Sequence, residues 1–405
     1  MSPCTHLPLL DDLPDVAGKN VLLRVDFNTP LHQVESGGWE VEDDYRIRMA
    51  MPTIQWLLDH GAEVTACSHL GRPHGEVDPR YSLEPVRERL VALAPGVKLL
   101  ENVRFDPGEE ECSQALVDRL IEGQDFFVND AFGVAHRKHA SVVGPPSRLP
   151  SAAGRLLARE AEVIGSLLEH PSRPFVAIVG GAKIAGKLGV LRTLASKAEV
   201  LMVGGAMAFT FLAALGHDVG ESLVDLDHLD SCRDLIDLGG RVMVPEDFIA
   251  VPAQHGVTRL EDGFAQGGEV KVVGRDIPPG WIGMDIGPKT ASSFAEELAG
   301  AGTVFWNGPM GAFEDERFEK GSRTIAEAVS RCGGFTVVGG GDSVCALDHF
   351  GLGATVDFVS TGGGASLDLL EHGDLPGLAA LRNSPLCAGR GAQGGVSPSV
   401  ATRHG

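Results

Sequence analysis

Two lysines stand shortly after a glycine pair. The apolar run 175–179 is followed by Gly180 and Gly181, and then by Lys183 and Lys187 in a segment that we expect to be helical. A buried strand that ends in glycines and passes straight into a helix places free backbone N–H groups beside both lysines on one face of that helix. Such an arrangement suits a phosphate. We therefore expect a phosphorylated ligand at this turn.

The same residues allow two other interpretations. Gly181 to Lys187 fits the spacing G-x-x-x-x-G-K of a P-loop, but the next residue is Leu188, which has no hydroxyl to offer a magnesium ion. A tight turn between strand and helix, with two solvated lysines, would also produce this pattern. Spacing alone does not decide between them.

A second group of candidate residues follows the strands that we expect in the first half of the chain. Apolar runs at 21–25, 63–67, 97–100 and 126–128 alternate with amphipathic stretches such as 45–60 and 83–93. Strands that alternate with helices predict a parallel sheet, and ligands bind such sheets beyond the carboxyl ends of the strands. The loops at those ends carry Asp26, Asn28, His69, Arg72 and Arg104, Arg137 follows a few residues past another strand end, and Arg46 starts the first helix.

Each of these residues alone is more simply a surface charge. Four arginines and a histidine at one end of one sheet are harder to explain in that way, because arginine clusters bind carboxylates and phosphates through paired hydrogen bonds. The run HRKH at 136–139 has no acidic or cysteine partner at ligand spacing, so we interpret it as a polar loop that supplies Arg137 rather than as a metal site. The first half is thus predicted to bind a small substrate with several negative charges.

Glycines end nearly every expected strand of the second half. The strands are expected at 200–203, 242–244, 281–286, 303–306, 335–338 and 358–360, and two triple-glycine turns at 339–341 and 362–364 open onto helices. Several helix N-termini beside a lysine predict a polyphosphate site, and a nucleotide is its natural ligand. Asp342 is either a magnesium contact or an N-cap, and Glu314 either accepts hydrogen bonds from ribose hydroxyls or is simply solvated.

Length and composition favour a cytosolic α/β enzyme of two or three domains. The chain has 405 residues, an apolar content of 43% and a formal net charge of −21, which argues against a nucleic-acid or anionic-membrane partner. The seven cysteines never form C-x-x-C, so we expect reduced thiols and no zinc or disulfide framework. The acidic N-terminus does not resemble an export signal.

Four other segments bear on the organisation of the chain. The uncharged run 200–216 approaches the length of a membrane span, but Gly204 and Gly205 divide it into a strand and a helix. Residues 152–170 lie between prolines and are expected to form one helix that links the two halves. The G-x-G-x-x-G pattern at 389–394 follows no strand, so we do not read it as a dinucleotide site, and the polar tail from 383 onward is expected to be disordered.

Taken in order, these motifs resemble those of phosphoglycerate kinases. The resemblance rests on an ordered set that spans residues 21–381: LLRVDFNTPL, RIRMAMPTI, SHLGRP, LLENVRF, VNDAFGVAHRKH, VGGAKIAGK, GGAMAFTF, MDIGP, FWNGPMGAFE, VVGGGDSV and STGGGASL. The resemblance implies reversible transfer of a phosphoryl group between 1,3-bisphosphoglycerate and ADP, which gives 3-phosphoglycerate and MgATP in glycolysis. It also implies a cytoplasmic monomer.

The site residues that the resemblance implies fall into three groups. The triose would be bound by Asp26, Phe27, Asn28, Arg46, His69, Leu70, Gly71, Arg72, Arg104 and Arg137. The nucleotide would be bound by Gly181, Lys187, Gly204, Gly283, Asn307, Pro309, Glu314, Gly340, Gly341, Asp342 and Ser343, with Asp342 facing Mg²⁺. Arg46, Lys183 and Lys187 would be catalytic.

The family also implies an α/β fold of two Rossmann-like three-layer domains with parallel sheets, joined by a hinge helix. We expect an N-terminal 3-phosphoglycerate-binding domain at 1–170 with 376–384 packed back onto it, a nucleotide-binding domain at 171–375, and a disordered tail at 385–405. Closure of the domains would bring the ligands in line and exclude water. Gly186, where many members carry an acidic residue, and Ser343, where threonine is commoner, depart from the family pattern.

The candidate residues agree with this chemistry on an independent point. They are mainly cations, with no aspartate in an H-R-D setting to remove a proton from a hydroxyl. An acyl phosphate exchanges with an oxygen that is already anionic, so positioning and charge stabilisation suffice. An NTPase that uses Gly181 to Lys187, or a module that binds nucleotide without turnover, remain the alternatives.

Overall fold

The computed structural model describes residues 6–34, 37–238, 241–253 and 269–390 of the chain, which folds as two compact units. The N-terminal unit contains Met1–Glu162 and Asp374–Gly405, and the C-terminal unit contains Val163–Gly373. The division falls inside helix α5 (Arg155–Glu169), eight residues before the boundary at 170 that we expected. The chain after 373 returns to the first unit.

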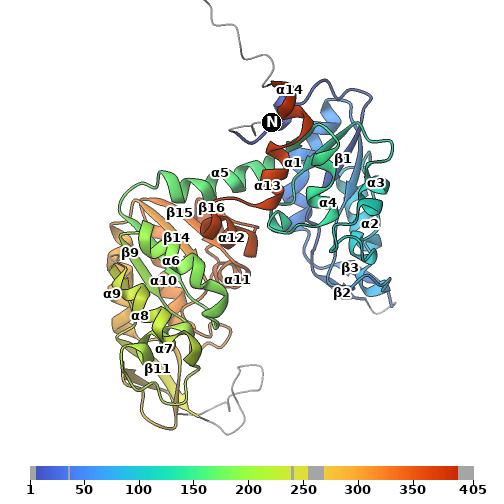
Figure 1. Ribbon diagram of the computed structural model, residues 1–405. Helices are drawn as coiled ribbons and strands as arrows, with labels where there is room; N and C mark the ends of the chain where they lie inside the picture. The colour runs from blue at the N-terminus through green and yellow to red at the C-terminus, as the bar shows by residue number, and fades with distance from the viewer. Residues whose placement is uncertain (1–5, 35–36, 239–240, 254–268, 391–405) are drawn as a thin grey trace, which may run out of the picture. The chain divides into compact units, whose positions relative to one another are not determined.

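The N-terminal unit is built on a five-stranded parallel sheet in the order β5-β4-β1-β6-β7. Figure 1 labels its central strand, β1. Its strands are β1 (Asn20–Arg24), β4 (Glu63–Cys67), β5 (Lys98–Leu99), β6 (Phe126–Asn129) and β7 (Ser151–Ala153). Apolar runs such as VLL in β1 and FFV in β6 are fully buried, as expected for strands covered on both faces. One core joins β1 to Ile54 of helix α1 (Tyr45–Asp59) and Leu90 of helix α2 (Glu84–Leu93).

Helices accompany this sheet along its length. They are α1 (Tyr45–Asp59), α2 (Glu84–Leu93), α3 (Gln114–Ile121), α4 (Ala140–Val143), α13 (Pro376–Arg382) and α14 (Pro385–Arg390). Several loops contain short 3-10 turns, such as η3 (Val103–Phe105) and η4 (Phe132–Val134). A separate antiparallel hairpin of β2 (Leu31–Gln33) and β3 (Trp39–Val41) follows the loop after β1.

The C-terminal unit contains a six-stranded parallel sheet in the order β10-β9-β8-β14-β15-β16. The strands are β8 (Phe175–Val179), β9 (Val200–Val203), β10 (Arg241–Met243), β14 (Thr303–Asn307), β15 (Phe335–Gly339) and β16 (Phe358–Val359). Val176 and Ile178 point to one face of this sheet, where they pack with Phe294, Ile325 and Leu347. The strand alternation therefore builds a core on that face beneath three helices.

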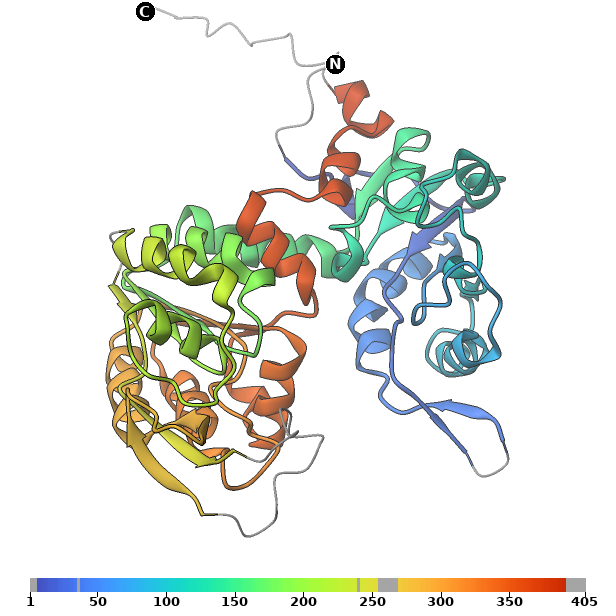
Figure 2. The ribbon, with the colours of Figure 1, turned by 60° about the horizontal axis from the view of Figure 1, so that its bottom comes forward.

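Figure 2 shows helices on both sides of this sheet. They are α6 (Leu188–Lys197), α7 (Met207–Ala214), α8 (Leu229–Asp237), α9 (Pro288–Ala299), α10 (Lys320–Arg331), α11 (Gly341–His349) and α12 (Gly364–His372). The run 200–216 divides into β9 and α7 as predicted. In the described part of the chain, no helix combines the length and the apolar character that crossing a membrane requires.

One strand that we expected in the second half does not belong to the parallel sheet. β13 (Trp281–Ile286) pairs antiparallel with β11 (Asp247–Pro252), which also pairs antiparallel with β12 (Lys271–Gly274). These three strands form a sheet of their own in the order β12-β11-β13, separate from the six-stranded parallel sheet. Ile249, Ile282 and Met284 help to form a small apolar cluster on this sheet.

Two further predictions are corrected at the ends of helices. Residues 152–170 do not form one helix, because 151–153 pair with β6 as β7 and the helix begins at Arg155. Of the tail expected to be disordered, Pro385–Arg390 forms α14, where proline occupies the first helical position and Cys387 is buried. Residues 391–405 lie outside the described part of the chain.

Candidate active site

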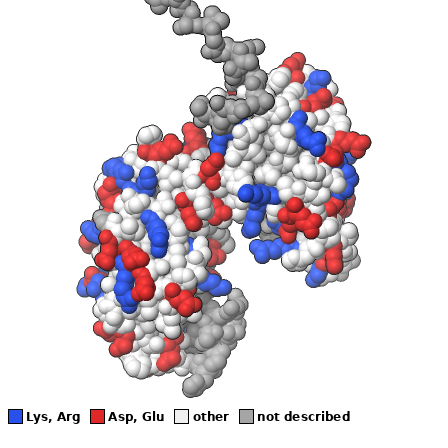
Figure 3. All heavy atoms as spheres, viewed as in Figure 1, with Lys and Arg blue, Asp and Glu red and all other residues white. Residues whose placement is uncertain are grey.

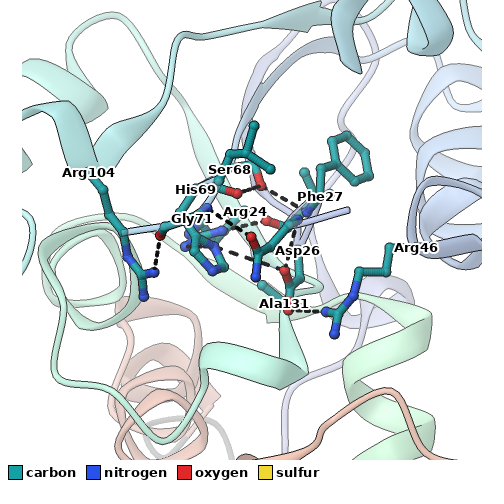
Figure 4. A network of polar contacts seen from close by, with 12 residues as sticks. Arg24, Asp26, Phe27, Arg46, Ser68, His69, Gly71, Arg104 and Ala131 are labelled. Carbon is teal, nitrogen blue, oxygen red and sulfur yellow. Dashed lines mark hydrogen bonds and ion pairs between the residues drawn. The ribbon is translucent and has the colours of Figure 1, made fainter. Parts of the chain in front are cut away.

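Asp26 lies at the centre of a polar cluster beyond the carboxyl end of β1 (Figure 4). Its Oδ2 accepts a hydrogen bond of 2.6 Å from Nη1 of Arg46, which stands in the first turn of α1. Burial raises the pKa of Asp26, but the nearby guanidinium groups of Arg46 and Arg24 lower it by more. The pKa of Asp26 therefore lies below its usual value. A Cβ at Gly133 would approach Asp26 Oδ2 to 2.4 Å, so glycine permits this close packing. Asp26 is therefore a carboxylate at neutral pH.

His69 follows β4 and is only 3% exposed. Burial lowers the pKa of His69 to about 3, against the opposing effect of Asp26. Its Nδ1 lies 3.4 Å from Nη2 of Arg24 and 4.0 Å from Oδ1 of Asp26. Because the imidazole is neutral at physiological pH, the contact with Asp26 is not an ion pair.

The side chains of Asn28 and Arg104 both hydrogen-bond to the backbone of Gly71, in the loop after β4. The Gly71 N–H donates to Oδ1 of Asn28 over 2.9 Å, and the Gly71 carbonyl accepts from Nη1 of Arg104 over 2.7 Å. Gly71 has a φ of 59°, and a Cβ there would lie 2.3 Å from the Tyr81 ring, so both conformation and space require glycine. We call Asp26, Asn28, Arg46, His69 and Arg104 the N-terminal polar cluster.

The remaining predicted substrate residues divide into two kinds. Arg72 and Arg137 are exposed, and neither side chain forms an ion pair with any residue that the structure describes. Phe27 and Leu70 bury their side chains in the hydrophobic core and offer only backbone groups; the Phe27 N–H is already bonded to Ser68 Oγ. Acidic and basic side chains are interspersed over the face of this unit seen in Figure 3. The two exposed arginines are thus available for an anion.

In the C-terminal unit, the ends of three neighbouring strands meet through glycines. A Cβ on Gly308 would lie 2.3 Å from the Gly180 carbonyl oxygen, and one on Gly205 would lie 2.5 Å from the Gly181 nitrogen. Gly181, Gly205 and Gly308 have φ values of 105°, 63° and 100°. On Gly204, a Cβ would meet Met310 Sδ at 2.3 Å. These contacts leave no room for side chains, so backbone lines the turn.

Lys187 is held at this turn by two oxygen atoms. Its Nζ donates to the Gly180 carbonyl over 2.7 Å and to Oδ1 of Asn307 over 2.8 Å. Burial lowers the pKa of Lys187 to about 8, and the Asp342 carboxylate raises it in part. The lysine therefore remains largely protonated at pH 7.

Asn307 connects this lysine to the first triple-glycine turn. Its Nδ2 donates to the Gly339 carbonyl over 2.9 Å, and a Cβ on Gly340 would lie 2.8 Å from that Nδ2. Gly340 has a φ of 91° immediately before α11. The Gly308 N–H donates to the Ser343 hydroxyl, so the hydroxyl that serine shares with threonine is used here.

The prediction that both lysines lie on one face of a helix that starts at the glycines is wrong. After Gly181 the chain runs through a loop and the 3-10 turn η6 (Ala185–Lys187), and α6 begins only at Leu188. Lys187 is the N-cap of α6, whereas Lys183 lies in the loop, is exposed, and has no ion-pair partner among the described residues. No hydrogen bond or ion pair among the described residues joins Lys183 to Lys187.

Two other predicted nucleotide residues are not gathered with Lys187. Glu314 is exposed in the loop after Pro309 and makes no hydrogen bond to the part of the chain that is described. Gly283 lies in β13, where its N–H donates to Ser222 Oγ over 3.0 Å and a Cβ would meet the Phe209 ring at 2.5 Å. Its close packing accounts for glycine without a ligand.

Asp342 is the one predicted metal contact. It is exposed in the first turn of α11, without a hydrogen bond or ion pair to the described residues. Across those residues, no three His, Cys, Asp or Glu side chains gather as a ready metal site. A single free carboxylate fits Mg²⁺ that is held mainly by nucleotide phosphates.

Sequence reasoning missed four polar residues behind the N-terminal polar cluster. Asn102, 3% exposed, accepts from the N–H groups of Leu70 and Arg104 through Oδ1, over 3.2 and 3.1 Å. Arg24, Glu109 and Ser141 are wholly buried. Arg24 gave a usable signal, because a charge inside the run VLLRV is unusual for a strand buried on both faces. Glu109 and Ser141 gave none.

The family assignment follows from sequence and structure together. The family model described as phosphoglycerate kinase matches residues 10–98 and 92–373. The chain is 47% identical to the phosphoglycerate kinase of Parafrankia sp. (strain EAN1pec) over 408 residues, which cover 92% of this chain and 99% of that protein. It is 46% identical to that of Rubrobacter xylanophilus, over 91% of this chain and 96% of that protein.

Solved structures agree with this assignment. The phosphoglycerate kinase of Coxiella burnetii has a TM-score of 0.83 at 35% identity, and the match covers 93% of this chain and 99% of that one. The enzyme of Pyrococcus horikoshii has a TM-score of 0.79 at 28% identity, over 94% of this chain and 100% of that one. The family model, the sequence identities and these structures agree, and the chain belongs to the phosphoglycerate kinase family.

Proposed function

We propose that the N-terminal polar cluster, with Arg72 and Arg137, binds 3-phosphoglycerate or 1,3-bisphosphoglycerate, and that the glycine-lined turn around Lys187 binds ADP or ATP. This member of the phosphoglycerate kinase family acts in glycolysis by transferring a phosphoryl group between them. One observation carries the proposal: half-buried Asp26 and buried His69 lie among several arginines, two of which have no ion-pair partner in the described part of the chain.

The N-terminal polar cluster suits a small molecule that carries a carboxylate and a phosphate. Arg72 and Arg137 can each donate two parallel hydrogen bonds to an anionic group. Asp26 occupies one side of the Arg46 guanidinium, which fixes its orientation and leaves its other N–H groups for a ligand. Neutral His69 can donate one hydrogen bond without adding charge.

The C-terminal turn suits phosphates for a different reason. Its backbone is exposed by glycines, and Lys187 contributes a positive charge already desolvated by burial. A phosphate near Lys187 would favour its protonated form, so ligand binding would raise the pKa of the lysine. Gly340, Gly341 and Ser343 place the N-terminus of α11 beside it.

We propose that Asp342 would hold Mg²⁺ together with the nucleotide's own phosphates. The ion would neutralise charge on the phosphate oxygens, as metal ions do in phosphoryl transfer. The carboxylate of Asp342 is exposed and forms no hydrogen bond or ion pair with the described residues, so it is available for this role.

Arg46, Lys183 and Lys187 are proposed to stabilise the phosphoryl group in transit. The acceptor oxygen of 3-phosphoglycerate or ADP is already anionic, so no side chain has to remove a proton. Catalysis then consists of positioning and charge stabilisation, which fits a site made of cations and backbone N–H groups. Transfer also requires the two ligands to meet, so the proposal includes a movement of the units about α5.

The test is a coupled assay on the purified chain, with Arg46→Ala and Arg148→Ala as a matched pair. Arg148 is exposed and pairs with Asp118 outside the cluster. We expect ATP consumption that depends strictly on 3-phosphoglycerate, a fall of about 100-fold in kcat for Arg46→Ala, and wild-type turnover for Arg148→Ala. Near-normal turnover in Arg46→Ala would contradict the role, and ATP consumption without 3-phosphoglycerate would favour a simple NTPase.

We also propose that the enzyme works as a monomer in the cytoplasm. The described cysteines, such as buried Cys67 and exposed Cys345, are free thiols, which supports a reducing compartment. Sedimentation of the active enzyme checks the monomer.

A further inference from the structure

Arg24 brings a positive charge into the interior of the N-terminal unit, where it is 0% exposed. Its Nε donates to Ser141 Oγ over 2.8 Å, and its Nη1 donates to the Val25 carbonyl. Its Nη2 lies 3.4 Å from Nδ1 of His69. A buried guanidinium persists only where such partners and a counter-charge are present.

Glu109 supplies that counter-charge through Ser141. Oε1 of Glu109 accepts from Ser141 Oγ over 2.6 Å, and Oε2 accepts from the Ser141 N–H over 2.9 Å. Burial raises the pKa of Glu109, but His139, Arg24 and Ser141 lower it to about 2, so the group is anionic. His139 Nδ1 is 3.7 Å from Oε1, beyond hydrogen-bond length. The Ser141 hydroxyl gives its proton to Glu109 and must therefore accept from Arg24.

The protons of this chain of contacts fix the tautomer of His69. A guanidinium has only donors, so the Nδ1 that faces Arg24 must be the acceptor nitrogen of the ring. In a neutral imidazole the remaining proton then lies on Nε2. Nε2 has no hydrogen bond to any residue that the structure describes, so its N–H is free to point toward a ligand.

We propose that Glu109 and Ser141 hold Arg24 so that it keeps His69 as the Nε2-protonated tautomer, and that these three residues position the 3-phosphoglycerate site. The assignment of the tautomer stands on the 3.4 Å contact of Nδ1 with Arg24 and on the neutral state of the imidazole, since the Asp26 carboxylate, 4.0 Å from Nδ1, lies beyond hydrogen-bond length. The consequence for the triose rests on the proposed function. The opposite tautomer would turn a lone pair toward the anionic oxygen, which replaces a hydrogen bond with a repulsion.

The experiment is nitrogen NMR on the full chain labelled at histidine. The sequence holds 14 histidines, so His69→Gln is used to assign the His69 signals. The wild-type chain without ligand should show Nε2 protonated and Nδ1 bare at pH 7. The same spectrum is then recorded for Ser141→Ala, Glu109→Gln and the control Ser147→Ala, whose exposed hydroxyl donates to the Gly144 carbonyl near α4 and not to this network.

Titration of 3-phosphoglycerate and of ADP into each variant completes the test. We expect Ser141→Ala and Glu109→Gln to mix the His69 tautomers and to weaken 3-phosphoglycerate binding by about tenfold, with ADP binding unchanged and Ser147→Ala like wild type. If Glu109, Ser141 and Arg24 only stabilised the fold, a variant that still binds ADP would keep the wild-type tautomer of His69.

Three results separate the alternatives. A wild-type spectrum with the proton on Nδ1 overturns the proposal even if every variant fails to fold. An unchanged Nε2–H signal in folded Ser141→Ala and Glu109→Gln overturns the positioning role. Tautomer mixing without any loss of triose binding, together with normal binding by His69→Gln, would refute the proposed substrate site and leave the tautomer assignment standing.

Discussion

Lys187→Met separates the catalytic value of a buried lysine from its effect on stability. Burial lowers the pKa of Lys187 from its ordinary 10.5 to about 8. At about 1.4 kcal/mol per unit, the folded state is disfavoured by about 3 kcal/mol when the lysine is charged, and by less after allowance for its partial exposure. Methionine removes this cost, but it leaves Asn307 Oδ1 and the Gly180 carbonyl without a donor, which costs roughly 1–3 kcal/mol.

The two effects nearly cancel at pH 7. We therefore expect the unfolding free energy of the C-terminal unit to change by less than about 2 kcal/mol, whereas kcat should fall at least about 100-fold because the charge at the transferred group is lost. Hydrogen exchange of the β8 and β14 amides measures the first quantity, and the 3-phosphoglycerate-dependent assay measures the second. Exposed Lys183→Met is the stability control.

The difference in unfolding free energy between wild type and Lys187→Met should depend on pH. Below pH 8 the lysine is charged in both states and its full cost is present; as pH rises toward 10.5 the folded state loses its proton first and the cost disappears. Wild type should therefore gain up to about 3 kcal/mol of stability relative to Lys187→Met over this range. A constant difference across the range, or near-normal turnover by Lys187→Met, would refute the reasoning.

Three other substitutions follow from single contacts. Asp130→Asn should stabilise the N-terminal unit at pH 8 but not at pH 4 in denaturant titrations. Burial raises the pKa of Asp130 to about 7, so the ionised carboxylate destabilises the folded state at pH 8, whereas an amide oxygen can still accept from the N–H groups of Leu156 and Leu157. A loss of stability at pH 8 would contradict this. Gly340→Ala should weaken ADP binding about tenfold by calorimetry, because Gly340 has a φ of 91° and a Cβ there would displace Asn307. The control Gly351→Ala should leave ADP binding unchanged, since Gly351 has a φ of 70° and open space around it. Equal effects of the two substitutions would point to backbone strain alone. Asn102→Ala should raise the KM for 3-phosphoglycerate more than that for ATP, since its amide joins the loops of Leu70 and Arg104, and equal changes in both KM values would count against that role.

The sequence was sufficient for most of the two parallel sheets. Strand 63–67 and strand 281–286 were predicted with the bounds that the structure has, because mainly apolar segments end there before Ser68 and before Gly287-Pro288. The partner of 281–286 could not be predicted, since an apolar strand of this length fits a parallel or an antiparallel neighbour. The short strand 151–153 was missed because SAA is too brief to show a period and is continuous with a helical pattern.

Residue type gave the site better than spacing did. Polar residues that follow the expected strands were predicted to lie at one end of the sheet, because parallel strands bring their carboxyl ends to one edge. The structure adds the hydrogen bonds of Asp26 with Arg46 and of Arg104 with Gly71, which the sequence did not predict. The spacing of Lys183 and Lys187 suggested a shared helix face that the loop before α6 does not provide. Glu109 and Ser141 lie far from Arg24 in sequence, and only tertiary packing brings them together.

The central claim is that each unit binds one ligand. Hydrogen exchange with one ligand at a time tests it most directly, because bound ligands protect the loops that they contact. The account predicts that 3-phosphoglycerate alone protects peptides at 24–29, 69–72 and 102–105, and that MgADP alone protects peptides at 180–188, 307–309 and 339–343. Protection of the same unit by both ligands, or of each ligand's loops by the other, would contradict it.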